Sequence, residues 1–311
     1  MNLNEKVVHI LKSSCSNGTW KQYESSLKKW IEYCTTNNLN VYESRIENYL
    51  SFLASLFESG LGYNSINTAR SALSSVFPLI ENSKIGEHRL ISQFMKGVSK
   101  LRPPRPKYSI TWDTNSMLEL LKSWDCNVID LKTITLKLIA LLALVTAQRA
   151  QTLTSIKISD IVWGSPVQIK LSSILKTTSI KNPNPVLVIP SFDSTNLCPV
   201  HTLHCYIDKT KDIRKESDQL FISFVPPHKP VTSQTISHWL CKVLEMSNID
   251  TSVFSGHSFR HASTSKASSR GVSIDSIFQR AGWSSGSKVF AKHYNKRIDD
   301  RSNFANVLLN E

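Results

Sequence analysis

The residues best suited to chemistry in this sequence are cationic or aromatic, and they lie far apart along the chain. Arg149 directly follows the apolar segment ALVTAQ, where a guanidinium is costly to bury without an anionic partner. The segment HSFRH brings His257, Arg260 and His261 within about one helical turn, so that their side chains share a face. Two imidazoles and a guanidinium on one face suit a phosphate better than a metal ion.

A second group of such residues lies elsewhere in the same half of the sequence. AGWSSGSKVFAKHY contains Trp283 and then Tyr294, on a predicted basic helix that also contains Lys288 and Lys292. Lys176 ends the first arm of a predicted β-hairpin, whose tip can reach into a groove. Taken singly, these residues are typical of a salt bridge, a solvated lysine or a packed tyrosine. The combination of these residues in this order indicates a function much more specifically than any one of them does.

The elements that must position these residues begin with an all-helical N-terminal part. In TWKQYESSLKKWIEYC we expect Thr19 to cap a helix whose apolar face holds Trp20, Tyr23, Leu27, Trp30 and Ile31. Three further helices are predicted, at Arg45–Phe57, Ser65–Phe77 and Glu87–Lys100.

A Pro-rich basic stretch, LRPPRPKY, follows these helices and should be extended. It predicts a helical domain at residues 1–101, a linker at 102–108 and a second domain at 109–311. We expect Arg102, Arg105 and Lys107 of this stretch to contact DNA.

The second domain is expected to combine helices with a small antiparallel β-sheet. PVQIKLSSILK and NPVLVIP are rich in β-branched and apolar residues and flank a turn-like segment, which predicts a hairpin. Helices are predicted at Asn115–Trp124, Leu131–Ala147, after CPV, at Ser233–Met246, after His257, at Ile274–Ala281 and at Ser287–Tyr294. The predicted fold class is therefore mainly α, with an α+β second domain.

Charge favours nucleic acid as the partner. The 311 residues carry a net charge of +13, and the pI is about 9.5. Up to Arg105 there are 13 Lys and Arg against 8 Asp and Glu, which leaves 24 against 16 beyond it. Both parts are thus basic, as expected if both contact duplex DNA. Solubility alone accounts for such a charge about equally well.

Neither cysteine spacing nor hydropathy points to secretion or to a membrane. The six cysteines contain no CxxC pair, which predicts reduced thiols in an intracellular protein. No signal peptide is visible, and the most apolar stretch, Ile134–Val145, is too short to span a bilayer. We expect a soluble protein located where DNA is, which is the nucleus in a eukaryote.

The order Arg, hairpin Lys, His-x-x-Arg-His, Trp, Tyr resembles that of the tyrosine recombinase (phage integrase) superfamily over essentially the whole chain. The segments that carry the resemblance include TAQRAQTL, ILKTTS, HSFRHASTSKA and AGWSSGSKVFAKHY. They are most similar to the recombinases of DIRS- or Ngaro-type retroelements and Cryptons. The resemblance implies a C-shaped, two-domain clamp on duplex DNA, tetrameric synaptic complexes, and roles in DNA integration and transposition of a mobile element.

The resemblance also assigns roles residue by residue. It implies that the catalytic residues are Arg149, Lys176, His257, Arg260, Trp283 and Tyr294. His261 is expected to support the site rather than to contact the phosphate. Lys288 and Lys292 are expected to contact DNA. The family usually has an acidic residue three positions after the first Arg, and here that position is Thr152.

These residue types fit attack by a tyrosine oxygen on a phosphodiester. Two guanidiniums can bind the non-bridging oxygens in the transition state, and His257 and the Trp283 indole can each donate a further hydrogen bond. Lys176 is placed to give a proton to the leaving 5′-oxygen. We therefore expect a 3′-phosphotyrosine at Tyr294, with no cofactor and no metal ion.

Other interpretations remain beside the recombinase. A type IB topoisomerase-like enzyme would share the chemistry, and a domesticated mobile-element protein would bind DNA without cutting it. CPVHTLHC also offers Cys198, His201, His204 and Cys205 as zinc ligands, but its spacing fits no standard finger and it reads as the start of a helix.

Overall fold

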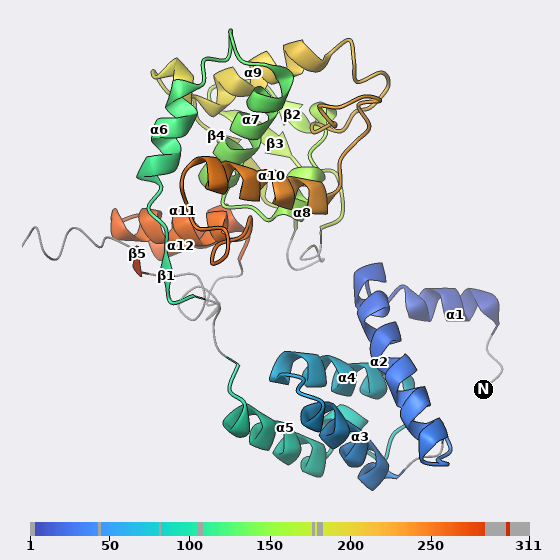
Figure 1. The fold of residues 1–311 in the computed structure, drawn as a ribbon. Coiled ribbons are helices and arrows are strands. Elements are labelled where there is room, and N and C mark those ends of the chain that lie inside the picture. The colour runs from blue at the N-terminus through green and yellow to red at the C-terminus, as the bar shows by residue number, and fades with distance from the viewer. Residues whose placement is uncertain are drawn as a thin grey trace, which may run out of the picture. The chain divides into compact units, whose positions relative to one another are not determined.

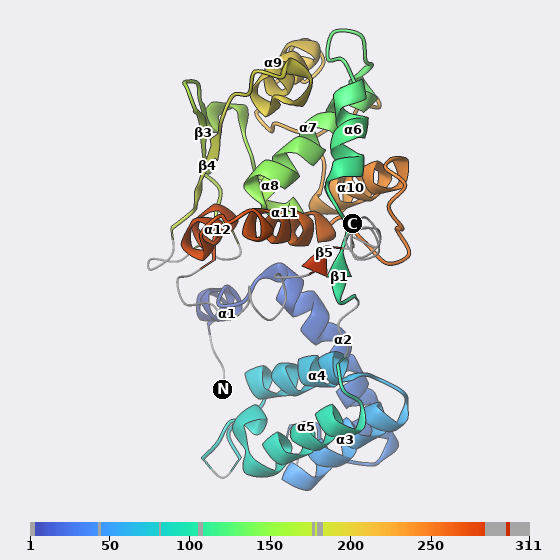
Figure 2. The ribbon, with the colours of Figure 1, turned by 90° about the vertical axis from the view of Figure 1, so that its left-hand side faces the viewer.

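The computed structural model describes residues 4–42, 45–80, 82–104, 108–175, 178, 183–283 and 297–298. The chain forms two compact units, Met1–Pro106 and Lys107–Glu311, which are shown in Figures 1 and 2. No helix within the described ranges is long and apolar enough to cross a membrane.

The first unit is built from helices. They are α1 (Glu5–Lys12), α2 (Asn17–Thr36), α3 (Ile46–Glu58), α4 (Tyr63–Val76), the 3-10 turn Ile85–Glu87 and α5 (Arg89–Leu101). The four predicted helices are confirmed to within a few residues, whereas α1 was not predicted.

Aromatic packing holds the core of this unit together. Trp30 is fully buried and stacks on Tyr49 at 4.6 Å between ring centroids. Two details of the prediction for α2 are wrong. Ser16, not Thr19, is the N-cap, because its Oγ accepts from the Thr19 amide. Ile31 is 49% exposed, so the apolar face is narrower than its spacing suggested.

The second unit combines helices with short strands. Its helices are α6 (Asn115–Ser123), α7 (Leu131–Thr146), α8 (Ala150–Thr154), α9 (Pro199–Thr210), α10 (Ser233–Met246), α11 (Ser258–Ser269) and α12 (Ile274–Ala281). Its strands are β1 (Ile110–Thr111), β2 (Ile161–Val162), β3 (Val167–Lys170), β4 (Val186–Ile189) and β5 (Arg297–Ile298). The predicted helices from 115 to 281 are confirmed, but the short α8 was not predicted.

The sheet has the strand order β2-β3-β4 and is antiparallel throughout. In the β3–β4 hairpin, Ile169 is paired with Leu187 and both are buried. Alternate residues therefore face the core, as expected for a sheet with one covered face. A hairpin is confirmed between β3 and β4, but its first strand ends at Lys170 rather than near Lys176, which lies outside the described residues. Strand β2 extends the sheet and was not predicted.

Helix α7 is the centre of this unit. Asp130 caps its start by accepting a hydrogen bond from the Thr133 amide at 2.8 Å. Nearly all its side chains from Ile134 to Ala143 are buried, as expected for an apolar helix covered on all sides. Helices α9, α10 and α11 pack around it (Figure 1). The turn that ends α7 is thereby placed against α11.

A short parallel strand pair joins the two ends of this unit. Ile110 is paired with Arg297 and Thr111 with Ile298. Both strands lie against α11 (Figure 2). The neighbouring Trp112 indole donates a buried hydrogen bond of 2.8 Å to Ser258 Oγ, at the start of α11. The backbone at residues 297–298 thus lies beside α11.

Candidate active site

The turn between α7 and α8 carries the first candidate residue. Ala147 ends α7 in the left-handed conformation, with φ of 51°, which is uncommon for a residue with a Cβ. The turn exposes the Ala147 carbonyl to α11 and lets Arg149 begin α8 as a half-buried N-cap. A backbone outlier therefore lies two residues before the guanidinium, as is common where a site is held in a fixed geometry.

Arg260 is fixed against this turn. Its side chain is only 1% exposed, and its Nη1 donates to the Ala147 carbonyl at 2.7 Å. Its guanidinium lies over the Trp283 ring, with 4.3 Å from Cζ to the ring centroid. A hydrogen bond and a cation–π contact together restrict the guanidinium to one orientation. The structure thus brings Arg149, Arg260 and Trp283 to one place.

The start of α11 approaches α10 so closely that a side chain would not fit. A Cβ built on Gly256 would lie 2.8 Å from the Ser237 carbonyl oxygen. The Gly256 amide also donates to Cys241 Sγ at 3.2 Å. Gly256 therefore sets where His257 and the first turn of α11 begin.

His257 lies in a positive environment. Although it is an exposed residue, enough protein surrounds its ring that burial lowers its pKa, and the charges of Arg260 and Arg149 lower it further. The imidazole is consequently neutral at pH 7 and can donate one hydrogen bond. That both arginines act on this ring places His257 in the same cluster as Arg149 and Arg260.

His261 packs behind His257. Their ring centroids are 5.4 Å apart, and His261 also makes an edge contact with Tyr108 at 5.5 Å. His261 is 8% exposed. It therefore packs beneath His257, and its supporting role stays a prediction.

Two contacts place Trp283 under Arg260. Gly282 ends α12 in the left-handed conformation, with φ of 65°, and the Trp283 amide donates to the Phe278 carbonyl at 2.9 Å. Gln148 Nε2 donates to the Arg280 carbonyl at 2.8 Å, so the residue before Arg149 is tied to the end of α12. Gln148, Arg280 and Gly256 were not predicted from the sequence, and of these three only Gly256 is of a residue type that signals a special backbone position.

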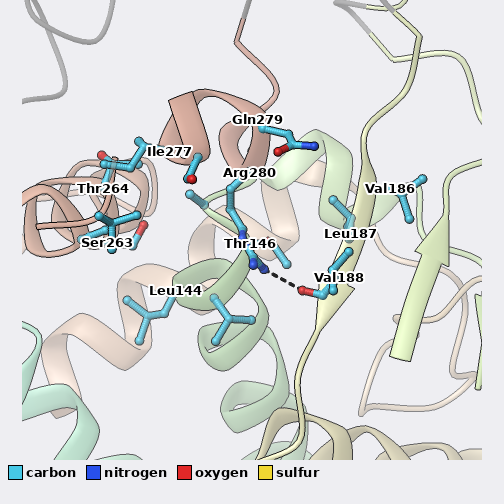
Figure 3. A pocket seen from close by; sticks show the side chains of 15 residues that line it. Leu144, Thr146, Val186, Leu187, Val188, Ser263, Thr264, Ile277, Gln279 and Arg280 are labelled. Carbon is cyan, nitrogen blue, oxygen red and sulfur yellow. Dashed lines mark hydrogen bonds between the residues drawn. The ribbon is translucent and has the colours of Figure 1, made fainter. Parts of the chain in front are cut away.

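A cavity of this unit lies beside the site rather than in it. Its volume is about 460 Å³, and it lies between the end of α7, strand β4, α11 and α12 (Figure 3). Arg280 crosses it and donates to the Val188 carbonyl at 2.6 Å. Arg149, His257, Arg260 and Trp283 do not line it. The Arg280 bond joins α12 to strand β4.

Several predicted site residues lie outside the described residues, namely Arg105, Lys107, Lys176, Lys288, Lys292 and Tyr294.

Arg102 has a contact within the first unit. Its Nη1 donates to the Phe57 and Leu61 carbonyls at 3.1 and 2.5 Å, and its guanidinium lies 4.1 Å from the Phe57 ring centroid. These bonds satisfy one carbonyl in the last turn of α3 and one just beyond it. Arg102 thus links α5 to the C-terminal end of α3 and stabilises the helical unit.

Comparison with known proteins identifies a family. The sequence matches the Phage integrase family over residues 113–301. No curated protein sequence matches the chain. Among solved structures, the chain is similar to a lambda integrase dimer bound to a COC′ core site, with 20% identity and a TM-score of 0.54 over 96% of this chain and 76% of that one.

Two further structures share the fold. A XerH site-specific recombinase in a post-cleavage complex with palindromic difH has 14% identity and a TM-score of 0.61, over 94% of this chain and 80% of that one. A Tn1549 transposon integrase in complex with circular intermediate DNA has 14% identity and a TM-score of 0.52, over 86% of each chain. At such identities the likeness establishes the fold alone.

Proposed function

The chain belongs to the phage integrase family, and on this basis we propose that it is a site-specific DNA recombinase that cuts and rejoins duplex DNA through a 3′-phosphotyrosine at Tyr294. One observation carries the proposal. Residues distant in sequence, Arg149, His257, Arg260 and Trp283, lie together around the end of α7. A cationic cluster of this kind supports binding of a phosphodiester.

The proposed transition state places negative charge on the two non-bridging oxygens. Arg260 is already held by the Ala147 carbonyl and the Trp283 ring, so little reorganisation is needed when this charge develops. Arg149 supplies a second guanidinium from the adjacent turn. Neutral His257 donates a hydrogen bond rather than a charge.

The proposed nucleophile is Tyr294 and the proposed proton donor is Lys176. Attack by the Tyr294 oxygen forms the phosphotyrosine and breaks the bond to the 5′-oxygen, which takes a proton from Lys176. Reversal by another 5′-hydroxyl rejoins the strand. Because the cationic side chains stabilise the charge, the proposal requires no metal ion at the scissile phosphate.

The wider assignments rest on the same family. We propose that Arg105, Lys107, Lys288 and Lys292, together with the remaining donors of Arg102, contact the DNA backbone, and that residues 1–101 form the second arm of a clamp. Strand exchange would then occur in a tetramer on paired sites. The segments TAQRAQTL, ILKTTS, HSFRHASTSKA and AGWSSGSKVFAKHY support an origin in a DIRS- or Ngaro-type retroelement or a Crypton. The protein would act inside the cell where DNA is, which is the nucleus if the cell is eukaryotic.

The test is to incubate the full chain in EDTA with a labelled, nicked suicide duplex that contains its target site, and to map the labelled peptide. Wild type should form a covalent adduct at Tyr294. Tyr294→Phe should bind the duplex as tightly but form none, whereas Tyr42→Phe, which alters a 72% exposed tyrosine of the first unit, should behave as wild type. An adduct at another residue, or cleavage that stops in EDTA, contradicts the mechanism.

Two outcomes would favour the alternatives. Relaxation of supercoiled DNA without any requirement for paired sites would point to a type IB topoisomerase-like enzyme. Tight binding by wild type with no adduct at all would point to a domesticated DNA-binding protein.

A further inference from the structure

A second cluster of reactive side chains lies in the same unit, away from the cationic site. Cys126, His201 and Cys205 place one sulfur or nitrogen atom each within 4.8 Å of the other two. They form the one such group of three or more His, Cys, Asp or Glu residues within the described ranges. We propose that these three residues bind a thiophilic metal ion, preferably Zn²⁺, in a structural site. This proposal does not depend on the proposed recombinase function.

The helix supplies two of the ligands in a suitable arrangement. His201 and Cys205 are four residues apart on α9 and therefore lie on one face. Cys205 Sγ is 3.6 Å from His201 Nε2. Bond lengths to tetrahedral zinc of about 2.3 Å for sulfur and 2.05 Å for nitrogen place these two atoms roughly 3.6 Å apart. The pair is thus spaced for one ion.

The third ligand comes from the segment that joins α6 to α7. Cys126 is 1% exposed, and its Sγ lies 3.6 Å from Thr202 Oγ1, on the same face of α9. The fully buried Lys137 of α7 donates its Nζ to the Trp124 carbonyl, two residues before Cys126. This bond fastens the Cys126 segment in place without an ion, so the site is preorganised.

The chemistry of the ligand set favours zinc. Two thiolates and an imidazole suit Zn²⁺ better than Mg²⁺ or Ca²⁺, which prefer oxygen. Two thiolates also balance the charge of the ion. His201 and Cys205 are half-buried, which leaves solvent access for a water molecule as the fourth ligand.

The neighbouring cysteine and histidine have other contacts. Cys198 Sγ accepts from the His201 amide at 3.4 Å and so caps α9, and His204 stacks on Trp163 at 4.0 Å between centroids. In the segment CPVHTLHC, His201 and Cys205 are therefore the proposed ligands, whereas Cys198 and His204 make structural contacts. The ligand that completes the set, Cys126, is distant in sequence, which explains why the spacing matched no zinc motif.

The experiment uses the full reduced chain and titrates it with Co²⁺, which reports thiolate coordination through a charge-transfer band, followed by displacement with Zn²⁺. Wild type should bind one ion. Cys126→Ser, Cys205→Ser and His201→Gln should each weaken binding at least tenfold, whereas Cys15→Ser and His204→Gln should bind as wild type does. Absence of the band in wild type, or equal loss in the controls, overturns the proposal.

Two measurements on wild type guard against variants that fail to fold. Zn²⁺ at a hundredfold excess over Kd should raise the Tm by roughly 5 to 10 °C, and it should protect Cys205, but not Cys15, from alkylation. A Cys126–Cys205 disulfide in unreduced protein, together with no metal binding after reduction, would overturn the zinc site in favour of a redox pair. Cleavage of the suicide duplex by folded Cys126→Ser should stay at the wild-type rate, which separates this test from that of the recombinase.

Discussion

Two histidine clusters in the Lys107–Glu311 unit differ in the neighbours of the imidazole. His257, at the start of α11, is influenced by two guanidiniums, whereas His201, on α9, lies beside two thiols. The two helices lie at opposite ends of this unit in both views (Figures 1 and 2). Guanidiniums disfavour a bound cation and select an anion, while thiols select a thiophilic metal. A histidine in a sequence therefore predicts little until its neighbours are known.

The clusters also differ in how they are held. The cationic site depends on tight backbone features: a left-handed Ala147, a glycine with no room for a Cβ, and a guanidinium between a carbonyl and an indole. The thiol cluster depends on one helical turn and a fastened loop. Small changes in shape should consequently damage the first more than the second.

The largest expected effect tests whether the cationic site needs guanidinium geometry or only positive charge. Arg260→Lys keeps the charge but loses the planar fork, so single-turnover cleavage should slow on the order of a hundredfold or more. Duplex binding should change much less. The matched control is Arg214→Lys, another buried arginine of this unit, whose Nη1 donates to the Gln219 carbonyl at 2.8 Å. An equal loss of rate in the folded control would mean that packing, not phosphate binding, accounts for the effect.

The next prediction compares two lysines of the hairpin. Lys176→Ala should slow cleavage of an ordinary phosphodiester and should be rescued by a 5′-thio leaving group, which needs no proton. Lys181→Ala serves as the control and should change neither rate much. Rescue of the Lys181 variant alone would reassign the proton donor. Both lysines lie outside the described residues, so this assignment still rests on the sequence.

Local patterns predicted much of this fold because they depend on neighbours in the chain. The apolar run of α7, the HSFRH turn and the β3–β4 hairpin could all be found from periodicity and residue type. β1 and β5 could not, because two-residue strands carry no pattern and their pairing joins Ile110 to Arg297. Cys126 and His201 likewise come together only through the packing of the α6–α7 segment on α9.

The importance of some residues around the site could not be predicted from their residue type. Gln148 and Arg280 act through bonds to backbone carbonyls, which any polar residue could make in principle. Ala147 adopts a conformation that its sequence does not favour, because the Arg260 bond and the packing of α7 determine it. The roles of such positions can be recognised only once the tertiary contacts are known.

A smaller effect should follow from the close approach at Gly256. Gly256→Ala would force a Cβ to within 2.8 Å of the Ser237 carbonyl, so the start of α11 must shift, at a cost of about 1 to 3 kcal/mol in the free energy of unfolding. Gly164→Ala is the control, because its Cβ would lie at an ordinary 3.5 Å from the Pro166 carbonyl. Denaturant unfolding of both variants measures this. A neutral Gly256→Ala would show that α11 can move, and that His257 is held less firmly than we infer.

The smallest expected effect concerns the charge that reaches His257. Burial lowers the pKa of His257 first, and Arg260 and Arg149 lower it further. Arg149→Gln should therefore raise this pKa by removing one of the two charges, which an NMR titration of the imidazole can follow. Arg270→Gln, a change of an exposed arginine at the far end of α11, should leave it unchanged.

The same shift sets the sign of a stability effect. Because the folded protein holds the His257 proton less tightly than the unfolded chain does, the stability contributed by this residue is fully present above the ordinary pKa of about 6.5 and is lost as the pH falls through the folded pKa. Arg149→Gln should reduce this loss, so its free energy of unfolding should fall less than that of wild type between pH 7 and pH 5. If the two proteins lose stability in parallel, the charge of Arg149 does not act on His257. Arg149 would then lie farther from His257 than the lowered pKa of His257 indicates.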